Sequence, residues 1–360
     1  MDTPAFLDIA NLTKSYGDFT ALLPINLSVS EGEFLTIVGP SGSGKTTLIK
    51  LLVGMEEQTG GTISLRGERL DVLPANKRPT CMVFQPLALF PHRSVGENIE
   101  FPLKIKGIDP SVRRVRADEL LTLFRLPQDF YHKRISECSG GERQRIALAR
   151  ALAFDPEILF FDEPLSALDY RLRKTLEKEL KALHVRTGKT FIYITHSLEE
   201  AMVMSDRIAI LRNGRFEQIG PAKEIYAEPR SRFVAEFMGD VNLFDIVPDE
   251  VSGEPLAEDI DRTAVSSASW ESVPGEQRVL MVRPEMLVFL QPGEKADFEI
   301  DGVISAEYML GSRTQYEIKT ASGRVVSVER SSASPMFQDD GRVRLGFSLE
   351  NCHVIKEPVS

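Results

Sequence analysis

The sequence contains few cysteines and no long hydrophobic run. Its three cysteines, Cys81, Cys138 and Cys352, cannot all pair within one chain, and their spacing matches no zinc motif, which favours a reducing cytosol. The longest apolar stretches, such as Ile158–Phe161, have the length of a strand, far below the ~18–20 residues that span a bilayer. The first ten residues lack the basic start and apolar stretch of a secretory signal, so we expect none.

The composition is that of a folded protein with unevenly spread charge. Hydrophobic residues make up 42% and charged residues 27% of 360 positions, which excludes a wholly disordered chain and predicts two or three domains. The net charge of −10 falls entirely in residues 241–360, because residues 1–240 contain equal numbers of acidic and basic side chains. Neither part is a basic platform, so we expect no nucleic-acid partner.

The residue pattern changes near position 240. Residues 1–235 alternate short apolar runs with helical patterns, which is typical of an α/β fold on buried parallel strands. Residues beyond 240 form β-rich stretches between Gly, Pro, Ser and Asp clusters. We therefore predict an α/β domain at 1–239, with a helical insertion at about 94–155, and an all-β, barrel-like domain at 240–360.

Particular segments carry this prediction. In residues 171–188, four leucines fall on one helix face, and Gly188 provides a stop. Residues 250–277 are polar and acidic, so we interpret them as a loop or an insertion. The expected strands are Phe34–Val38, Met82–Phe84, Ile158–Phe161, Phe191–Thr195 and Ile208–Leu211 in the first domain, and Arg278–Phe289, Gly302–Met309 and Arg324–Val328 in the second.

A glycine-rich segment lies between the strand Phe34–Val38 and a helical run. It fits the phosphate-loop pattern G-x-x-x-x-G-K-[ST] in full, although a structural glycine-rich turn is the alternative. Its glycines let backbone N–H groups point at phosphate oxygens, and the helix offers its positive N-terminus. Lys45 can reach the β and γ phosphates of a nucleotide, and the Thr46 hydroxyl can ligate Mg²⁺. The predicted nucleotide-binding residues here are Gly39, Pro40, Ser41, Gly42, Ser43, Gly44, Lys45, Thr46 and Thr47.

Two further strands end in polar residues suited to phosphate chemistry. The run 158–161 delivers Asp162 to a strand tip, where it can hold Mg²⁺, and Glu163 can accept a proton from an attacking water. His196 follows the strand Phe191–Thr195, where we expect contact with the γ phosphate. A charged end of a core strand and a structural histidine are the alternatives. We predict Glu163 and His196 as catalytic.

The segment from Cys138 to Arg145, Cys-Ser-Gly-Gly-Glu-Arg-Gln-Arg, closely resembles the signature motif of ABC transporter ATPases. The resemblance extends over residues 5–235 and implies an ATP-binding, phosphate-loop ATPase core. It further implies that Tyr16 stacks on adenine, that Gln85 serves catalysis and Mg²⁺, and that Asp169 belongs to the site through the motif Ser166-Ala167-Leu168-Asp169. His196 matches the family's switch histidine.

The signature motif also has a physical interpretation. Ser139, Gly140 and Gly141 precede a helical run, so backbone donors and a helix N-terminus form a second anion site. The resemblance implies that this site contacts the γ phosphate of ATP bound to a partner, in a head-to-tail homodimer that closes on ATP and opens after hydrolysis. Cys138 stands where the family commonly has Leu, and we expect it to act as a buried hydrophobe. Glu142 stands where Gln is common and adds negative charge.

The C-terminal part narrows the resemblance to importers. Val282-Arg283-Pro284-Glu285 and residues 302–311 resemble the oligonucleotide-binding-like regulatory domain of importer ATPases, which we expect to contact its twin or to bind a small ligand. The segments 77–85 and 88–92 resemble polyamine and ferric-ion importers. This implies a peripheral subunit on the cytoplasmic face of the inner membrane, with two permease subunits and an extracytoplasmic solute-binding protein.

The favoured solute is a polyamine such as spermidine or putrescine, and the alternatives are ferric ion, phosphonate, sulfate or sugar. Two rivals lie outside import. A soluble ABC ATPase of translation or DNA repair commonly has two cassettes or a long coiled coil, whereas this sequence has one phosphate loop and no sustained heptad run. A module that senses ATP without turnover is disfavoured because Glu163 and His196 fill both catalytic positions.

Overall fold

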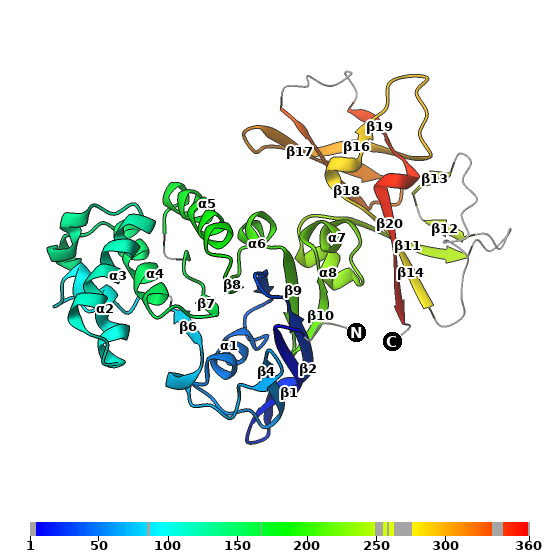
Figure 1. Cartoon of the computed structure of the whole chain (residues 1–360). Helices are drawn as coiled ribbons and strands as arrows, with labels where there is room; N and C mark the ends of the chain where they lie inside the picture. Colours follow the sequence, from blue (N-terminus) through cyan, green and yellow to red (C-terminus); the bar gives the residue numbers. More distant parts are fainter. Residues whose placement is uncertain are drawn as a thin grey trace. The chain divides into compact units, whose positions relative to one another are not determined.

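The computed structural model describes residues 5–84, 87–166, 168–248, 255–257, 259–262, 276–332 and 341–358. The chain divides into two compact units, Met1–Ala222 and Lys223–Ser360 (Figure 1). The sequence-based boundary at 239/240 stays a prediction. No helix among the described residues combines the length and the apolar character needed to cross a membrane.

The first unit is built on a six-stranded sheet. Its strand order is β10-β9-β3-β8-β7-β6, parallel except for β10, which pairs antiparallel with β9. β3, β7 and β8 are almost wholly buried, as the short apolar runs predicted. The strands are β3 (Phe34–Val38), β6 (Thr80–Val83), β7 (Ile158–Asp162), β8 (Thr190–Ile194), β9 (Arg207–Arg212) and β10 (Arg215–Gly220).

A second, antiparallel sheet of order β2-β1-β4-β5 belongs to the same unit, and the sequence pattern had not revealed it. The pairing of β1 with β2 contains three register shifts, which break the alternation that marks a regular half-buried strand. The strands are β1 (Leu7–Tyr16), β2 (Phe19–Val29), β4 (Gly60–Leu65) and β5 (Glu68–Arg69).

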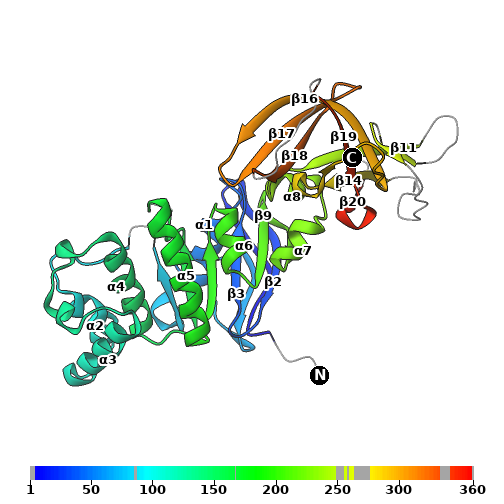
Figure 2. The same cartoon turned by 90° about the horizontal axis from the view of Figure 1, so that it is seen from above.

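Two hydrophobic cores cover the two faces of the parallel sheet. Successive strand residues point to opposite faces, so Phe160 packs with α1 and the antiparallel sheet, whereas Phe161 packs with α5 and the helices of the insertion. Figures 1 and 2 show α2, α3 and α4 grouped beside α5. The helices are α1 (Lys45–Val53), α2 (Val95–Ile105), α3 (Pro110–Leu123), α4 (Gly140–Ala153), α5 (Tyr170–Thr187) and α6 (Leu198–Met204).

Helix boundaries follow local capping signals. The predicted helix in residues 171–188 is confirmed as α5, with Leu176, Leu180 and Leu183 buried. Asp169 caps its start by accepting a hydrogen bond from the Leu172 N–H at 3.0 Å. Gly188 ends the helix in the left-handed conformation at φ 61°.

In the second unit, the short helices α7 and α8 precede a β-rich part, and the described residues beyond 240 form strands and two 3-10 turns, as predicted. One sheet has the order β12-β11-β14-β20 and the other β15-β19-β16-β17-β18, with β13 paired to β16, and all these pairs are antiparallel. The elements are α7 (Ala222–Ala227), α8 (Arg232–Phe237), β11 (Asn242–Pro248), β12 (Pro255–Ala257), β13 (Asp261–Arg262), β14 (Glu276–Val282), β15 (Val288–Phe289), β16 (Phe298–Met309), β17 (Arg313–Thr320), β18 (Val325–Ser331), β19 (Arg342–Phe347) and β20 (Cys352–Pro358).

For the segment Glu250–Gln277, the expectation of a loop is wrong in the described parts, which contain β12, β13 and the start of β14. β12 pairs with β11 and β13 pairs with β16, both antiparallel, so short segments of this region add strands to existing sheets. The remainder of that segment lies outside the described residues. Arg283 of the motif Val282-Arg283-Pro284-Glu285 is 2% exposed and donates to the carbonyls of Ala235 at 2.9 Å and Tyr226 at 3.0 Å. These hydrogen bonds connect α7 and α8 to the end of β14.

Candidate active site

The phosphate loop connects the centre of the parallel sheet to α1. It leaves β3, which lies between β9 and β8, and curls through Gly42 and Gly44 in left-handed conformations at φ 77° and 107°. A Cβ atom on Gly39 would lie 2.0 Å from the Leu211 carbonyl oxygen, so the loop passes too close to β9 for any side chain there. The glycines of the sequence pattern are therefore required by this conformation.

The start of α1 suits an anion. Gly44 caps this nine-residue helix without a side-chain hydrogen bond, and its first turn contains no acidic residue. Ser41 and Thr46 are exposed, whereas Ser43 is buried and its Oγ atom has no hydrogen-bond partner among the described residues. Because no side chain caps this end, the first-turn N–H groups of α1 can bind phosphate oxygens, and the residues fit the phosphate tail of a nucleotide.

Lys45 lies folded over the loop. Its Nζ atom donates to the carbonyl oxygens of Gly39 at 2.7 Å and Pro40 at 3.0 Å, and the residue is 9% exposed. Burial lowers the pKa of Lys45, and the nearby Glu163 and Asp162 carboxylates partly oppose this. The ammonium group is held in the loop by acceptors that phosphate oxygens can replace, which is the geometry expected of a phosphate-binding lysine.

Asp162 and Glu163 follow each other at the tip of β7. Burial raises the pKa of Asp162, the charge of Glu163 adds to this, and Lys50 and Lys45 oppose it. Glu163 takes a left-handed conformation at φ 46°, unusual for a residue with a side chain, and donates its N–H to the Ile194 carbonyl at 2.9 Å. The backbone therefore turns sharply after Asp162 and fixes the next carboxylate over the neighbouring strand.

His196 lies next to that carboxylate. β7 and β8 run parallel with Asp162 opposite Ile194, so the residues that follow each strand are neighbours. The Nδ1 atom of His196 lies 3.2 Å from Oε2 of Glu163, and the imidazole is exposed. The structure thus brings together Lys45, Asp162, Glu163 and His196, which were predicted from segments far apart in the sequence.

The signature segment forms a separate site at the start of α4. Ser139 Oγ accepts from the Glu142 N–H at 3.3 Å, and the Ser139 N–H donates to Glu142 Oε2 at 2.7 Å, which completes a capping box. Cys138 is buried, as expected. Among the described residues, no hydrogen bond or ion pair joins Ser139, Gly140 or Gly141 to the phosphate loop, and α4 lies apart from α1 in both views (Figures 1 and 2).

The remaining predicted residues have varied placements. Tyr16 ends β1, is 43% exposed and has the Lys14 ammonium 4.7 Å from its ring centroid, so much of the ring is accessible. Asp169 is engaged as the cap of α5. Gln85 lies outside the described residues, as does Ala167 of the Ser166–Asp169 motif.

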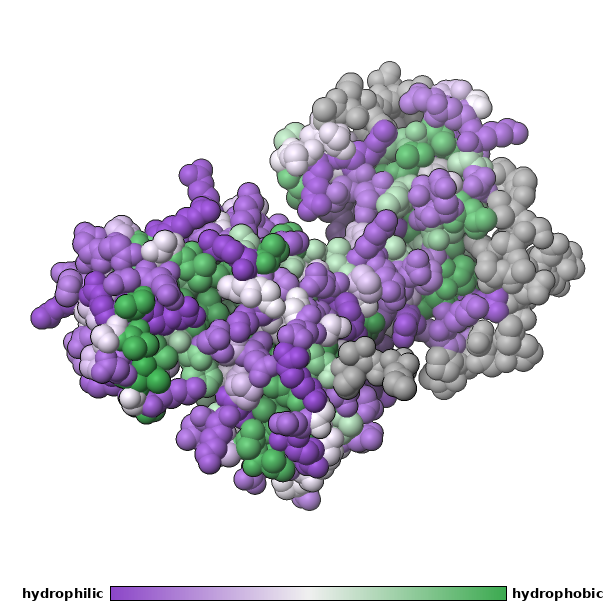
Figure 3. All heavy atoms as spheres, in the orientation of Figure 1, coloured by the Kyte–Doolittle hydropathy of each residue, from purple (hydrophilic) through white to green (hydrophobic). Residues whose placement is uncertain are grey.

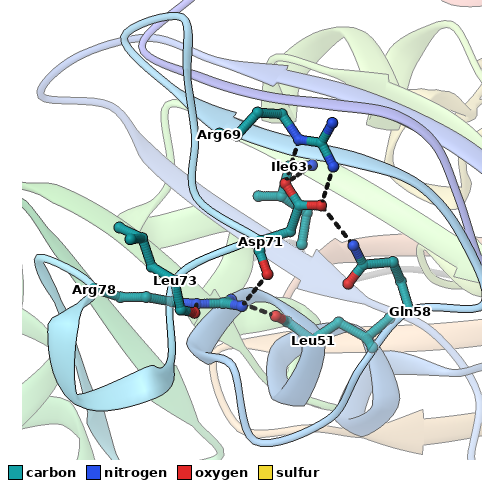
Figure 4. Close-up of polar contacts among 7 residues, drawn as sticks. All are labelled: Leu51, Gln58, Ile63, Arg69, Asp71, Leu73 and Arg78. Atoms are coloured by element: carbon teal, nitrogen blue, oxygen red, sulfur yellow. Dashed lines mark hydrogen bonds and ion pairs between the residues drawn. The ribbon is translucent and has the colours of Figure 1, made fainter.

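One buried arginine that supports this site was missed by sequence reasoning. Arg78 is 3% exposed and donates from Nη1 to the Leu51 carbonyl at 2.7 Å and from Nε to the Leu73 carbonyl at 3.0 Å (Figure 4). Its Nη1 atom also donates to the Leu52 carbonyl at 2.8 Å. These contacts satisfy the last carbonyls of α1, whose other end begins the phosphate site. A Cβ atom on Gly54 would lie 2.7 Å from the Arg78 guanidinium, so this glycine makes room for it.

A second cluster in Figure 4 anchors the same region. Asp71 accepts from Arg69 and from Gln58 Nε2 at 2.6 Å, and its backbone carbonyl accepts from Arg78 at 3.4 Å. The Arg69 hydrogen bond is the main cause that lowers the pKa of Asp71. The role of Arg78 at the end of α1 could not be predicted from the sequence, because a single arginine before a strand belongs to no periodic pattern.

Two protein families match the chain. The ABC transporter family matches residues 22–166, which include the phosphate loop, the signature segment and Glu163. The TOBE domain family matches residues 280–355, which lie in the all-β unit.

Several relatives are similar over most of the chain. The spermidine/putrescine import ATP-binding protein PotA of Pseudomonas aeruginosa is 39% identical over 98% of this chain and 99% of its own length. The protein of that name from Roseobacter denitrificans is 50% identical over 68% of this chain and 67% of its own. The Fe(3+) ions import ATP-binding protein FbpC 1 of Rhizobium meliloti is 38% identical over 91% of each chain.

Among solved structures, the chain resembles the ATP-binding cassette MJ0796. The match to its dimeric, post-hydrolysis structure with ADP and Pi has a TM-score of 0.53 and 33% identity. It covers 60% of this chain and 98% of that one. The resemblance therefore concerns about three fifths of the present protein.

Proposed function

Because the chain belongs to the ABC transporter family, we propose that it is the ATP-hydrolysing subunit of an importer. The observation that carries the proposal is the 3.2 Å contact between Glu163 and His196, at the edge of the sheet from which the Lys45 loop also emerges. A module that only senses ATP would have no need of a base and a histidine at that place. The chain is thus an ABC-type ATPase with both catalytic positions filled.

Each residue of the site has a distinct chemical task. The α1 N-terminus and Lys45 bind the phosphate tail, and the exposed ring of Tyr16 stacks on adenine. Glu163 accepts the proton of the attacking water, and His196 orients it and contacts the γ phosphate. Mg²⁺ would be held by Thr46 and Asp162, with Gln85, and would neutralise charge on the β and γ phosphates.

The residues at this place suit a Mg²⁺ ion that is bound partly by the nucleotide, rather than a metal site built from protein ligands alone. The described residues contain no cluster of three or more His, Cys, Asp or Glu side chains suited to a metal. Mg²⁺ is usually bound through one or two carboxylates plus the phosphates of its nucleotide, so Asp162 and a hydroxyl are a sufficient protein contribution.

We also propose that two copies of the chain bind ATP together. Among the described residues, no hydrogen bond or ion pair joins the Ser139 segment to the phosphate loop of the same chain, yet both segments begin a helix, where an anion is stabilised. A head-to-tail homodimer would place each signature segment on the nucleotide of the other chain. The dimeric cassette named above, bound to ADP and Pi, supports this arrangement by similarity.

We propose that a hollow lined by residues of β6, α2 and α4 is the contact with the permease. It has a volume of about 290 Å³ and is mainly apolar. On the face drawn in Figure 3, hydrophobic atoms gather in patches over the helical region where α2, α3 and α4 lie. A short cytoplasmic helix of a permease would fit such a surface. The lining residues are Cys81, Met82, Val83, Ala88, Phe90, Phe101, Pro102, Ala147, Arg150 and Ala151.

The proposed setting is the cytoplasmic face of the inner membrane, where the homodimer attaches to two permease subunits and an extracytoplasmic binding protein delivers the solute. The favoured solute is spermidine or putrescine, because relatives named for their import match nearly the whole chain. Ferric ion is the second candidate, since a relative named for its import matches 91% of the chain at 38% identity. The all-β unit would contact its twin or bind a regulatory ligand.

Reconstitution tests this proposal. The full chain, assembled in liposomes with two candidate permease subunits, should hydrolyse ATP faster and accumulate radiolabelled spermidine when loaded binding protein is present. A complex containing Glu163→Gln is the matched control and should accumulate none. Stimulation and uptake with ferric ion alone would select the second candidate, and failure to co-purify with any permease would contradict a role in import.

A further inference from the structure

A carboxylate lies unusually close to the proposed γ-phosphate contact of this chain. Glu142 occupies the third position of α4, and its Oε2 atom accepts from the Ser139 N–H at 2.7 Å. The Ser139 hydroxyl in turn accepts from the Glu142 N–H at 3.3 Å. The capping box therefore fixes a negative charge one hydrogen bond away from the residue that, under the proposed function, binds a phosphate of the partner's ATP.

That charge persists at neutral pH. The hydrogen bond from Ser139 lowers the pKa of Glu142, and the nearby Lys133 adds to this. An ionised carboxylate repels phosphate oxygens, and the repulsion grows when a closing dimer replaces water between them with protein. ABC signature motifs commonly have the neutral Gln here, which can form the same capping box without the charge.

Lys133 is held where it can cancel this charge. Its Nζ atom lies 3.5 Å from Glu142 Oε2 and 3.9 Å from the centroid of the Phe130 ring. Its backbone is fixed on both sides, because its N–H donates to the Phe130 carbonyl and its carbonyl accepts from the Val95 N–H, each at 2.9 Å. The side chain is 27% exposed, so most of it is packed against its neighbours.

The other charged side chains near Glu142 form no ion pair with it among the described residues. Glu137 Oε2 accepts from the Arg134 N–H at 2.8 Å and caps the preceding 3-10 turn. Arg143 forms no recorded ion pair with Glu142 among the described residues. Among the described residues, Lys133 is therefore the cation that pairs with the Glu142 carboxylate.

We infer that Lys133 is a positioning residue that neutralises Glu142 and so keeps the Ser139–Gly141 segment receptive to the γ phosphate of ATP. The inference rests on the proposed function, because it assigns that segment to a phosphate. Under this inference, the positive charge of Lys133 offsets the negative charge that Glu142 brings in place of the neutral Gln, so the signature segment can still bind ATP. The effect is on binding and closure and leaves the proton transfer at Glu163 unchanged.

The test is a charge-specific rescue in the full-length chain. Lys133→Ala should raise the KM for ATP ~10-fold at low salt, the scale of one unpaired charge in a closing site, and change kcat much less. Lys133→Arg should behave as the wild type. Adding Glu142→Gln to Lys133→Ala should restore the KM, because the repelling charge is gone. A lost packing contact of Lys133 would not be restored by this second change.

Two controls, a series of ionic strengths and the variant Lys106→Ala, distinguish the proposed charge effect from a general loss of structure. The KM ratio of Lys133→Ala to wild type should shrink as ionic strength rises, since exposed charges are screened over ~10 Å at 0.1 M and ~3 Å at 1 M. Lys106→Ala removes another lysine that lies over an aromatic ring, Phe154 at 3.6 Å, away from the signature segment, and should leave the KM unchanged.

Equal impairment of Lys133→Ala with and without Glu142→Gln would overturn the inference, as would a wild-type KM for Lys133→Ala at low salt. Both results leave the proposed function standing. A wild-type chain that neither hydrolyses ATP nor dimerises with it would instead contradict the proposed function, and the inference with it.

Discussion

Glu163→Gln should hydrolyse ATP at least ~100-fold more slowly than the wild type while binding ATP normally. Glutamine preserves the size of the side chain and can still contact His196, whose Nδ1 atom lies 3.2 Å from Oε2. It cannot accept the proton of an attacking water. Because binding survives without turnover, an ATP-bound dimer should accumulate.

Phosphate release and size-exclusion chromatography with ATP measure the two outcomes. Glu157→Gln is the matched control, since Glu157 directly precedes β7, at the opposite end from Glu163, and pairs with Arg66 at 3.0 Å. It should turn over ATP at the wild-type rate. Near-normal hydrolysis by Glu163→Gln would reject Glu163 as the general base.

Lys45→Ala should weaken ATP binding at least ~10-fold, because hydrogen bonds to charged groups are each worth about 1.5–3 kcal/mol. It should also slow turnover ~100-fold, the usual loss when a donor to developing charge is removed. The Lys45 ammonium already lies in the loop, bonded to the Gly39 and Pro40 carbonyls, so little reorganisation separates it from phosphate oxygens.

Titration with a fluorescent ATP analogue and steady-state kinetics test this second expectation. Lys77→Ala removes an exposed lysine outside the site and should change neither quantity. Circular dichroism shows whether the loop variant remains folded. Unchanged affinity together with a wild-type rate would refute the role of Lys45.

The phosphate loop and the ends of the parallel strands were predictable because their chemistry is local. The loop from Gly39 to Lys45 passes so close to β9 that only glycine fits at some of its positions, and these glycines are visible in the sequence. Asp162 and His196 follow short apolar runs, and parallel strands deliver their ends to one edge of the sheet. Position along the chain was therefore enough to predict which side chains meet.

Other features depend on tertiary contacts that leave no periodic trace. The irregular pairing of β1 with β2 hid the antiparallel sheet, and short strands such as β13 exist only because β16 offers an edge. Arg78 acquires its role from the end of α1, and Lys133 from the 3-10 turn that brings it to Glu142. Neither pairing can be read from residue spacing.

The sharing of each ATP between two chains is tested most directly by photolabelling a mixture of variants. Tagged Lys45→Ala chains and untagged Gly140→Asp chains, both also carrying Glu163→Gln, are mixed with an ATP analogue that is photoreactive at the γ phosphate. Gly140→Asp adds bulk and negative charge to its own signature segment, so the one intact site combines Lys45 of the untagged chain with Ser139 of the tagged chain.

We predict that irradiation labels the tagged chain within its Ser139–Gly141 segment, although that chain has lost its own phosphate-binding lysine. Tagged chains alone should remain unlabelled. Label confined to the untagged chain, or a crosslink that places Ser139 beside the ATP of its own chain, would contradict the shared site.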